Sequence, residues 1–592
     1  MQFPVKRWIR PEAPVAAERA HGADLVRTLL DARGIRTAAA RDTFCRPQLT
    51  HLQHPSEMHG TIEAARAICA ALRTGRHIAI YGDYDVDGIM ATAILWHMIR
   101  ALAPQAPIRT YVPHRIEEGY GLNDDALRTL RAEGVDMVIT VDCGVSAIAE
   151  ARVAAEIGLE LVITDHHELQ PTGEVPVARA VVHPRLPSAQ RFGELCGAGV
   201  AWKLAWMIAE VWCGVDRESR DAAEKRAPLP EVLRKRLLSL LPLASIGTVA
   251  DVVPMLEENR VIVARGLTEI HHTGVVGLNA LLVSARLDSG PVDAEKVAFR
   301  LAPRINACGR MGHAEDAIEL FTTANASRAE ELSALLEELN EQRRTDDRAI
   351  FDEALAQVRA RHGDGKPRGI VLADEKWNLG IVGIVCSKLV DIYACPVILL
   401  TRNKDVYKGS GRSVPGIELH KVLADCSEHL LAFGGHAMAA GVKLDGSRIA
   451  AFTAAFEAAV DAVLPPSDQQ KPPLSIDCVC AIDDLDLATI QQIDALAPFG
   501  RENRKPSMLV EGVEITQLRV MGRAANHLEV NVRQRSNGQM RFLRMHWWDG
   551  AKHAQFLAKG TYIDVVVEPA LNNFRGIAEV EAKLVDFCVR PT

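Results

Sequence analysis

Short apolar runs alternate with amphipathic stretches from about residue 60 onwards. The runs HIAIYG (77–82), VDMVITVD (135–142) and LELVITD (159–165) are separated by segments whose apolar residues recur at helical spacing. Continuous apolar runs of this length, alternating with helices, are typical of parallel strands that are buried on both faces. The pattern therefore predicts an α/β domain built on a parallel sheet.

The pattern changes twice in the second half of the chain. A helical stretch without internal glycine or proline covers 326–363 and ends at its final glycine. At ~1.5 Å per residue it would extend roughly 55 Å, and helices of that length usually connect domains. Strand, helix and strand patterns over 369–400 predict a second α/β unit, and alternating runs such as HLEVNVRQ and YIDVVVEPA predict a C-terminal β-barrel or sandwich.

Composition is that of a globular protein with several cores. With 592 residues, 48% of them hydrophobic, the chain has room for about three or four domains. A charged segment (214–236) predicts a surface insertion, and a proline-rich segment (464–474) predicts a linker. The net charge of −8 argues only weakly against a nucleic-acid partner, because binding depends on a local basic groove rather than on the total charge.

Targeting and redox signals are absent from the sequence. The twelve cysteines form no CxxC pair, which predicts reduced thiols rather than a zinc ribbon or a disulfide framework. The first residues lack the apolar core of a signal peptide, and no apolar run is long enough for a membrane span. We therefore expect a soluble, cytoplasmic protein that does not contact a membrane.

Acidic residues and histidines follow three of the predicted strands. In an open parallel sheet, ligands bind beyond the carboxyl ends of the strands, so side chains at these ends should converge. Oxygen and imidazole ligands suit Mn²⁺, Mg²⁺ or Zn²⁺, and five or six of them can hold two ions. This chemistry predicts phosphoester hydrolysis by Asp83, Asp85, Asp87, Asp142, Asp165, His166, His167 and Asp251.

The stretch GDYDVDG (82–88) has two simpler interpretations. A calcium-binding EF-hand loop needs a glutamate at its twelfth position, where this chain has Ile94, and a helix before the loop, where this chain has an apolar strand. An acidic turn without function would explain this stretch alone. It does not explain why acidic residues also follow the other strands, so we favour the metal site.

Four motifs resemble the DHH phosphoesterase superfamily. They are, in chain order, GDYDVDG, VDCG, TDHH and ADVVP. Further motifs resemble the RecJ family of bacterial single-strand-specific exonucleases over nearly the whole chain; they are PHRIEEGYGL, APRINACGRM, GSGRS, FGGHAMAAG and PFGRENRKP.

The resemblance implies a domain order and a set of residue roles. The domains would be an N-terminal helical lead-in (1–55), a DHH catalytic domain (56–322), a connecting helix (323–365), a DHH-associated α/β domain (366–463) and an OB-fold (464–592). Two Mn²⁺ or Mg²⁺ ions would be held by Asp83, Asp85, Asp87, Asp142, His166 and Asp251. Asp142 would bridge the two ions, and His167 would face the scissile phosphate.

Residues outside the metal site would hold the DNA. The resemblance implies that Arg115, Ser410 and Arg412 bind the 5′ end, and that Arg304, Asn306 and Arg310 line the path of the strand, with His436 in a glycine-rich loop. Simple structural roles remain open, since Arg304 and Arg310 could form surface ion pairs and His436 could be a loop residue. Trp547 and Trp548 could stack on bases or pack in the barrel.

The sequence departs from the family pattern at a few positions. Asn378 stands where the family usually has histidine, and Glu502 and Arg504 stand where glycine and proline are usual. Cys143 replaces a frequent asparagine and has no assigned role. These departures concern the DNA path and the docking of the β-domain rather than the reaction.

The implied activity is 5′-to-3′ hydrolysis of single-stranded DNA to mononucleotides, in DNA repair and recombination. The implied partners are single-stranded DNA, a single-strand-binding protein and a helicase, with the enzyme acting as a monomer. One alternative is a DHH phosphodiesterase acting on short RNA or cyclic dinucleotides, although such enzymes are generally smaller and lack the OB-like tail. The other is a non-catalytic replication or repair scaffold, which would tend to lose metal ligands.

Overall fold

The chain folds into two compact units. The computed structural model describes residues 6–10, 23–115, 118–170, 172–187, 192–215, 228–363, 365–463, 472–522, 524–572 and 578–590. The larger unit comprises Pro47–Val463 with the short segment Gly500–Asn503, and the smaller unit combines the two ends of the chain. Most of the charged insertion expected at 214–236 and of the linker expected at 464–474 lies outside the described residues.

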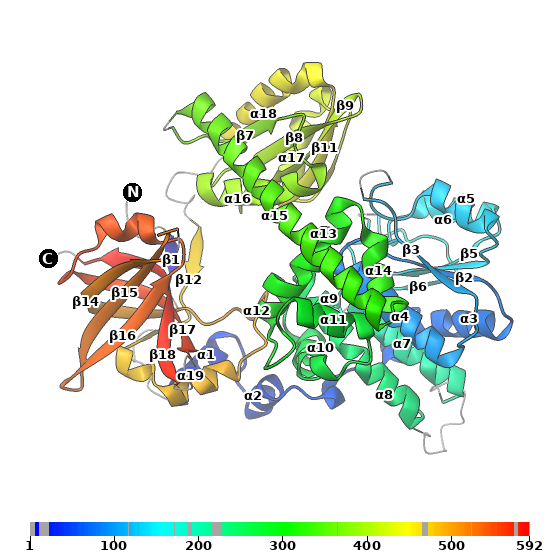
Figure 1. Ribbon diagram of the computed structural model, residues 1–592, viewed down its shortest axis with the longest axis horizontal. Helices are drawn as coiled ribbons and strands as arrows, with labels where there is room; N and C mark the ends of the chain where they lie inside the picture. Colours follow the sequence, from blue (N-terminus) through cyan, green and yellow to red (C-terminus); the bar gives the residue numbers. More distant parts are fainter. Residues whose placement is uncertain are drawn as a thin grey trace. The chain divides into compact units, whose positions relative to one another are not determined.

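The larger unit begins with a five-stranded sheet in which all neighbouring strands are parallel (Figure 1). In sheet order the strands are β3 (Ile108–Tyr111), β2 (Ile78–Tyr81), β4 (Met137–Thr140), β5 (Glu160–Thr164) and β6 (Ala180–Val182). This arrangement confirms the predicted parallel sheet, and three of its strands, β2, β4 and β5, end two residues before Asp83, Asp142 and His166.

Both faces of this sheet are buried. In β2, Ile78 and Ile80 belong to one hydrophobic core and Ala79 and Tyr81 to a second, because successive side chains point to opposite faces. The first core includes α3 (Thr61–Arg73), α4 (Val86–Leu102) and α7 (Gly197–Cys213), and the second includes α5 (Asp124–Ala132) and α6 (Ile148–Glu156). Burial on both faces explains why the strands are continuously apolar.

A helical region completes this domain. Its helices share the core of α4 and α7, and α8 and α9 contact both of these helices directly. They are α8 (Glu231–Ser239), α9 (Leu241–Ala250), α10 (Glu257–Thr268), α11 (Val276–Ser284), α12 (Ala294–Lys296), α13 (Ala302–Met311) and α14 (Ala314–Thr322).

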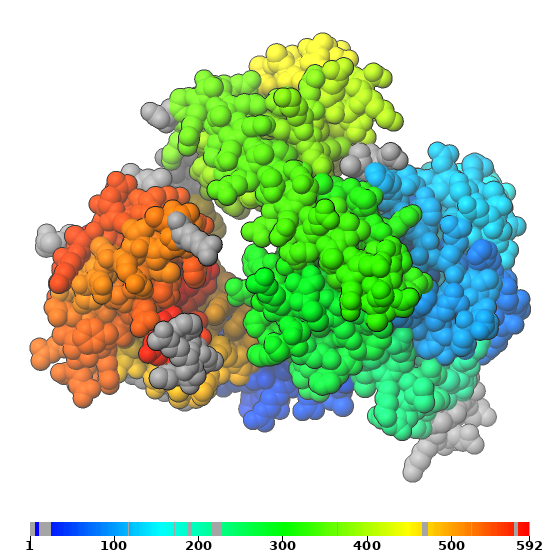
Figure 2. Space-filling view, in the orientation of Figure 1, coloured from blue at the N-terminus to red at the C-terminus, as the bar shows by residue number. Residues whose placement is uncertain are grey.

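The long predicted helix is present as α15 (Ala326–His362, 37 residues). Its buried side chains recur every three or four residues, with Leu332 and Leu336 in the core of the first domain and Ile350 and Ala354 in the core of the second. One helix therefore contributes to two cores. Figure 2 shows its surface continuing from the first α/β domain into the second.

The second α/β domain has a mixed five-stranded sheet. The strands are, in sheet order, β10 (Ala432–Gly435), β11 (Ala439–Leu444), β9 (Val406–Arg412), β8 (Val397–Asn403) and β7 (Ile370–Ala373). Only β7 and β8 are parallel. The helices are α16 (Leu379–Tyr393), α17 (Leu419–Asp425) and α18 (Ile449–Val463).

The smaller unit contains a five-stranded barrel, which confirms the predicted β-domain. Its strands follow one another as β14 (Met508–Met521), β15 (His527–Ser536), β16 (Gln539–Trp547), β18 (Glu579–Val589) and β17 (Tyr562–Asn572), and pairing of β17 with β14 closes the barrel. Strand β13 (Cys478–Cys480) extends the sheet beside β14, and α19 (Leu487–Asp494) packs against the barrel.

The N-terminal residues belong to this smaller unit. Strand β1 (Arg7–Ile9) pairs with β12 (Pro473–Ser475), and α1 (Ala23–Ala32) places Leu25 and Leu29 in the core of the barrel; α2 (Ala38–Cys45) follows. The described part of the lead-in holds this strand and two helices, and its association with the other end of the chain has no signal in the local sequence pattern.

Two further observations concern the whole described chain. All twelve cysteines are free thiols, most of them buried. None of the helices in the described ranges combines the length and the apolar character that a membrane crossing requires.

Candidate metal centre

The turn after β2 places three carboxylates at the edge of the sheet. Asp85 caps α4, since its Oδ1 accepts hydrogen bonds from the backbone N–H groups of Asp87 (2.8 Å) and Gly88 (3.1 Å). Asp83 and Asp87 are almost completely buried. The stretch GDYDVDG thus forms the turn between the end of β2 and the first residues of α4, which holds its three carboxylates close together.

The other predicted ligands meet these carboxylates. Asp142 follows β4, His166 follows β5, and Asp251 ends α9. The Nε2 atom of His166 lies 3.1 Å from Asp142 Oδ1, 3.6 Å from Asp251 Oδ2 and 3.8 Å from Asp87 Oδ2. The structure thus brings together all six residues that the sequence nominated as metal ligands.

Asp142 is central to this cluster. Ligand atoms lie within 4.8 Å of one another in three groups, which are Asp83–Asp85–Asp142, Asp87–His166–Asp251 and Asp142–His166–His167. Asp142 and His166 each belong to two of the groups, and of these two only the carboxylate of Asp142 has a second oxygen that could reach a second ion. Its backbone has φ 62°, a left-handed conformation that aspartate and asparagine tolerate better than most residues.

The donor atoms fit divalent cations with a preference for oxygen. Asp83 Oδ1, Asp142 Oδ1 and His166 Nε2 are buried and make no hydrogen bond with any residue that the structure describes. Burial holds the pKa of the nearby Cys143 thiol well above its usual value, so it would remain neutral rather than act as a ligand. Carboxylates and one imidazole suit Mn²⁺ or Mg²⁺.

Without a cation, ionisation of the clustered carboxylates is unfavourable. Burial and mutual repulsion raise the pKa of Asp83 and of Asp142 well above their usual value, and raise that of Asp87 to about 6 and that of Asp251 to about 7. Buried like charges have this effect because ionisation removes each carboxylate from water and brings it near another anion. Divalent ions would supply the missing positive charge.

His167 is held at the edge of the cluster by Asp165, which the sequence pattern nominated only as a possible metal ligand. Asp165 Oδ1 lies 2.7 Å from His167 Nδ1 and also accepts from the backbone N–H groups of both histidines. Burial lowers the pKa of His167, but the hydrogen bond and charge of Asp165 outweigh it and raise the pKa to about 9. The imidazole is therefore protonated at neutral pH.

Two more neighbours of His167 were missed. His183, fully buried, places Nε2 2.9 Å from the carbonyl oxygen of His167, and its Nδ1 accepts from Arg185 N–H. Tyr120 places its hydroxyl 3.1 Å from His167 Nδ1. The tyrosine lies in a quoted motif, whereas His183 carried no signal in the sequence.

Arginines gather beside the metal cluster. The guanidinium of Arg115 lies over the ring of Tyr84, 4.7 Å from its centroid, and Tyr84 stands between two of the predicted metal ligands. Burial, with Arg115, Arg343 and Arg412 nearby, lowers the pKa of Arg310 to about 10. Arg343, whose Nε has no hydrogen-bond partner among the described residues, was not predicted.

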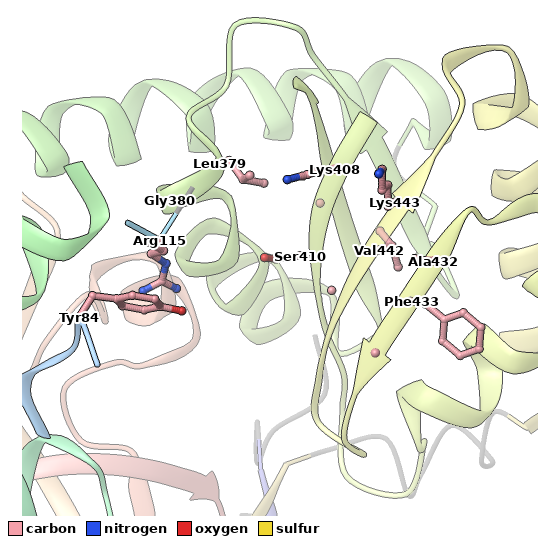
Figure 3. Close-up of a pocket in the computed structure, with 13 residues that line it drawn as sticks. Tyr84, Arg115, Leu379, Gly380, Lys408, Ser410, Ala432, Phe433, Val442 and Lys443 are labelled. Atoms are coloured by element: carbon pink, nitrogen blue, oxygen red, sulfur yellow. The ribbon is translucent and has the colours of Figure 1, made fainter. Parts of the chain in front are cut away.

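A cavity of about 460 Å³ opens between Tyr84 and the second domain. Figure 3 shows Lys408 and Ser410 pointing from β9 toward Arg115. Arg412, at the end of β9, lies against α16, because a Cβ added to Gly383 would come within 3.1 Å of its guanidinium. The cavity is therefore strongly basic, as a phosphate site requires.

The remaining predicted DNA contacts lie apart from this cavity or at its margin. Arg304 is mostly buried and forms an ion pair with Glu337 of α15. The structure therefore shows the ion-pair role that the sequence had left open for this residue. Asn306 is half-buried on α13. Arg310 donates to the carbonyl oxygen of Gly380 (2.9 Å), and His436 is exposed in the turn between β10 and β11.

The departures from the family pattern have local explanations. Asn378 caps α16 by accepting from the backbone N–H of Gly380 (2.8 Å). Glu502 has φ 60°, the left-handed conformation in which glycine is favoured. Arg504 lies 3.3 Å from Asp477, with which it forms an ion pair.

The two tryptophans have different environments. Trp547 packs against the barrel core and stacks on His553 with a centroid distance of 4.6 Å. Trp548 is 54% exposed beside His527 and His546. Packing in the barrel therefore fits Trp547, and stacking on bases fits Trp548.

Comparison with known proteins gives the same order of domains. Residues 77–241 match the DHH family, N-terminal domain, residues 366–462 match the DHHA1 domain, and residues 476–586 match the RecJ OB domain.

Whole-chain relatives agree. The chain is 35% identical over 592 residues to the single-stranded-DNA-specific exonuclease RecJ of Bacillus subtilis, covering 100% of this chain and 71% of the relative. It resembles the crystal structure of RecJ from Thermus thermophilus in complex with Mn²⁺, with a TM-score of 0.80 and 30% identity over 99% of this chain and 80% of that one. The corresponding Mg²⁺ complex gives a TM-score of 0.74 and 28% identity over 99% and 79%. From its motifs, its metal-ligand cluster and these similarities, the chain belongs to the RecJ family of the DHH phosphoesterases.

Proposed function

We propose that this protein is a divalent-metal-dependent exonuclease that removes mononucleotides from the 5′ end of single-stranded DNA. The observation that carries the proposal is the position of Tyr84, which lies between the ligands Asp83 and Asp85 and beneath the guanidinium of Arg115. A phosphate gripped in the basic cavity would thus lie beside the metal site. An enzyme that holds the end of a strand there would cut it close to that end.

The six converging residues would hold two ions. We assign the ends of the cluster to Asp83 with Asp85 and to Asp87 with His166 and Asp251, and the shared position to Asp142. Such ions supply Lewis-acid chemistry, because they lower the pKa of water and neutralise the charge that develops during phosphodiester hydrolysis.

His167 would act on the scissile phosphate from outside the ligand set. The hydrogen bond and charge of Asp165 raise its pKa, which favours the charged imidazolium as a hydrogen-bond donor. We therefore assign it the stabilisation of negative charge on the phosphate oxygens. Asp165 would keep the imidazole oriented and charged.

The basic cavity would bind the 5′ end. Arg412 and Arg115 present guanidiniums, and Ser410 a hydroxyl, a combination that suits a terminal phosphate. Lys408 and Lys443 extend the positive charge along the cavity. Asn306, Arg310 and His436 would contact the following phosphates, whereas Arg304 could do so only by leaving Glu337.

The remaining assignments concern the setting. We propose the domain limits 1–55, 56–322, 323–365, 366–463 and 464–592, with the OB domain binding the incoming strand. A single-strand-binding protein and a helicase would supply that strand during DNA repair and recombination. Because this substrate is chromosomal DNA, the proposed location is the cytoplasm, and the proposed active form is the monomer.

The test uses the full-length protein with Mn²⁺ and DNA labelled at either end. We expect mononucleotides from the 5′ end of single strands, with duplex DNA and dinucleotides left intact. The variant Asp142→Ala should keep its fold and lose cleavage. Preferred hydrolysis of the dinucleotide, or DNA binding without cleavage, would overturn the proposal.

A second comparison tests the grip on the 5′ end. Arg412→Ala should raise KM for 5′-phosphorylated strands and remove the preference for them over 5′-hydroxyl strands. The matched control is Arg402→Ala, since Arg402 belongs to the neighbouring strand β8 and pairs with Glu375. Equal effects of the two substitutions would contradict the assignment of Arg412.

A further inference from the structure

Three glycines lie directly behind the predicted metal ligands. A Cβ added to Gly197 would meet Asp142 Cβ and Oδ1 at 2.6 Å, and one added to Gly247 would meet Asp87 Oδ1 at 2.5 Å. Gly88 lies as close to Asp83, but there an added Cβ would meet the Cβ and the backbone N and O of Asp83 at 2.7 Å rather than its carboxylate. Carbon atoms in contact normally lie ~3.5–4.0 Å apart, so a methyl group would displace a carboxylate by about 1 Å.

These glycines come from three different helices. Gly88 lies in the first turn of α4, Gly197 is the first residue of α7, and Gly247 lies in α9. None of the three has a positive φ, so backbone conformation does not require glycine at these positions. The remaining reason for glycine is close approach, which involves the carboxylate of Asp142 at Gly197, and both Asp87 Oδ1 and the Ala198 Cβ (2.6 Å) at Gly247.

The start of α7 also binds one of these carboxylates directly. Asp87 Oδ2 accepts a hydrogen bond from the backbone N–H of Gly197 (2.6 Å), and Oδ1 accepts one from Ala198 (2.9 Å). Both N–H groups belong to the positive end of a 17-residue helix. The same turn of α7 therefore orients Asp87 through its backbone and leaves room for Asp142.

We propose that Gly197 and Gly247 are positioning residues that set the geometry of the metal-ligand carboxylates. Metal–ligand distances tolerate deviations of only about 0.2 Å, so a shift of about 1 Å would weaken binding. Residues that orient ligands typically change metal affinity by ~10–100-fold. This inference rests on the proposed role of Asp87 and Asp142 as ligands.

The test measures Mn²⁺ binding to the full-length protein by calorimetry and by electron paramagnetic resonance. Gly197→Ala and Gly247→Ala should each raise the Kd for Mn²⁺ at least tenfold and lower kcat, with an unchanged KM for single-stranded DNA. The control is Gly199→Ala, in the same helix, where the nearest atoms to an added Cβ all belong to the flexible Leu195 side chain. It should bind Mn²⁺ like the wild type.

The outcomes separate the inference from the proposed function. If the wild type does not bind Mn²⁺, the metal site itself is wrong. If the wild type binds Mn²⁺ and the two alanine variants bind it within twofold of that affinity, the positioning role is wrong. If neither variant folds, the role of these glycines lies in folding, and the inference fails as well.

Discussion

Removing one carboxylate from the metal centre should stabilise the metal-free protein while abolishing its activity. The scale follows from Asp87, whose pKa rises from 3.8 to about 6 in the fold. At pH values above both, a shift of that size costs about 3 kcal/mol of stability. Asp142 is fully buried in the same cluster, and asparagine in its place would be neutral and would tolerate the left-handed backbone. Because folding also raises the pKa of Asp142, we expect Asp142→Asn to be more stable than the metal-free wild type at pH 8.

The sign of the pH dependence distinguishes this cause from simple repacking. A carboxyl group whose pKa is raised by folding favours the folded state at low pH and opposes it increasingly as pH rises through the folded pKa. The advantage of Asp142→Asn should therefore be small below about pH 4 and grow toward pH 8. Asp136→Asn is the opposite control, because the backbone N–H of His77 lowers the pKa of Asp136, so this substitution should reduce stability.

The assay is thermal unfolding of the full-length protein after treatment with a chelator. The transition of the larger unit is identified by its shift when Mn²⁺ is added to the wild type. For a unit of this size, a gain of about 2–3 kcal/mol in the free energy of unfolding raises Tm by roughly 2–3 °C. Lower stability of Asp142→Asn at pH 8, a gain that does not depend on pH, or a retained Mn²⁺ shift would refute the reasoning.

Three further predictions follow from the structure. Mn²⁺ affinity should rise between pH 5.5 and 7.5 as Asp251, with its pKa of about 7, loses its proton, and calorimetry in two buffers should detect the released protons; a flat profile would contradict this. Glu502→Gly should stabilise the fold by about 1 kcal/mol in denaturant titration, because it relieves a left-handed backbone; a loss of stability would show that the glutamate side chain makes a compensating contact. Trp547→Ala should destabilise the barrel by ~3–5 kcal/mol. Trp548→Ala should weaken binding of single-stranded DNA in fluorescence titration and leave stability unchanged. The reverse pattern would refute the packing role of Trp547 and the stacking role of Trp548.

The sequence predicts the framework of the site because the relevant signals are local. Continuous apolar runs fix the strands, and the parallel sheet then brings Asp83, Asp142 and His166 to one edge, as expected. Asp251 lies at a helix end far from the others along the chain, and both its residue type and the motif ADVVP nominated it. These residues are aspartates and a histidine, the types that bind divalent cations, so they could be predicted from the sequence.

Residues that act through position were not predictable in this way. Arg304 has the same residue type as Arg310, but only the fold shows that Glu337 occupies it. His183 contacts the backbone carbonyl of His167, and Gly197 matters because it leaves space for Asp142. Neither role can be predicted from the residue type alone. The pairing of β1 with β12 likewise depends on two segments at opposite ends of the chain.

The unbroken helix α15 has a mechanical consequence. It has no glycine or proline over its 37 residues, and it belongs to the cores of both domains of the larger unit, so it acts as a strut rather than as a hinge. Widening the space between the two domains would require bending this strut and breaking backbone hydrogen bonds along it. Movement of one domain away from the other would therefore have to bend α15, since no flexible link within the helix allows the domains to turn about it.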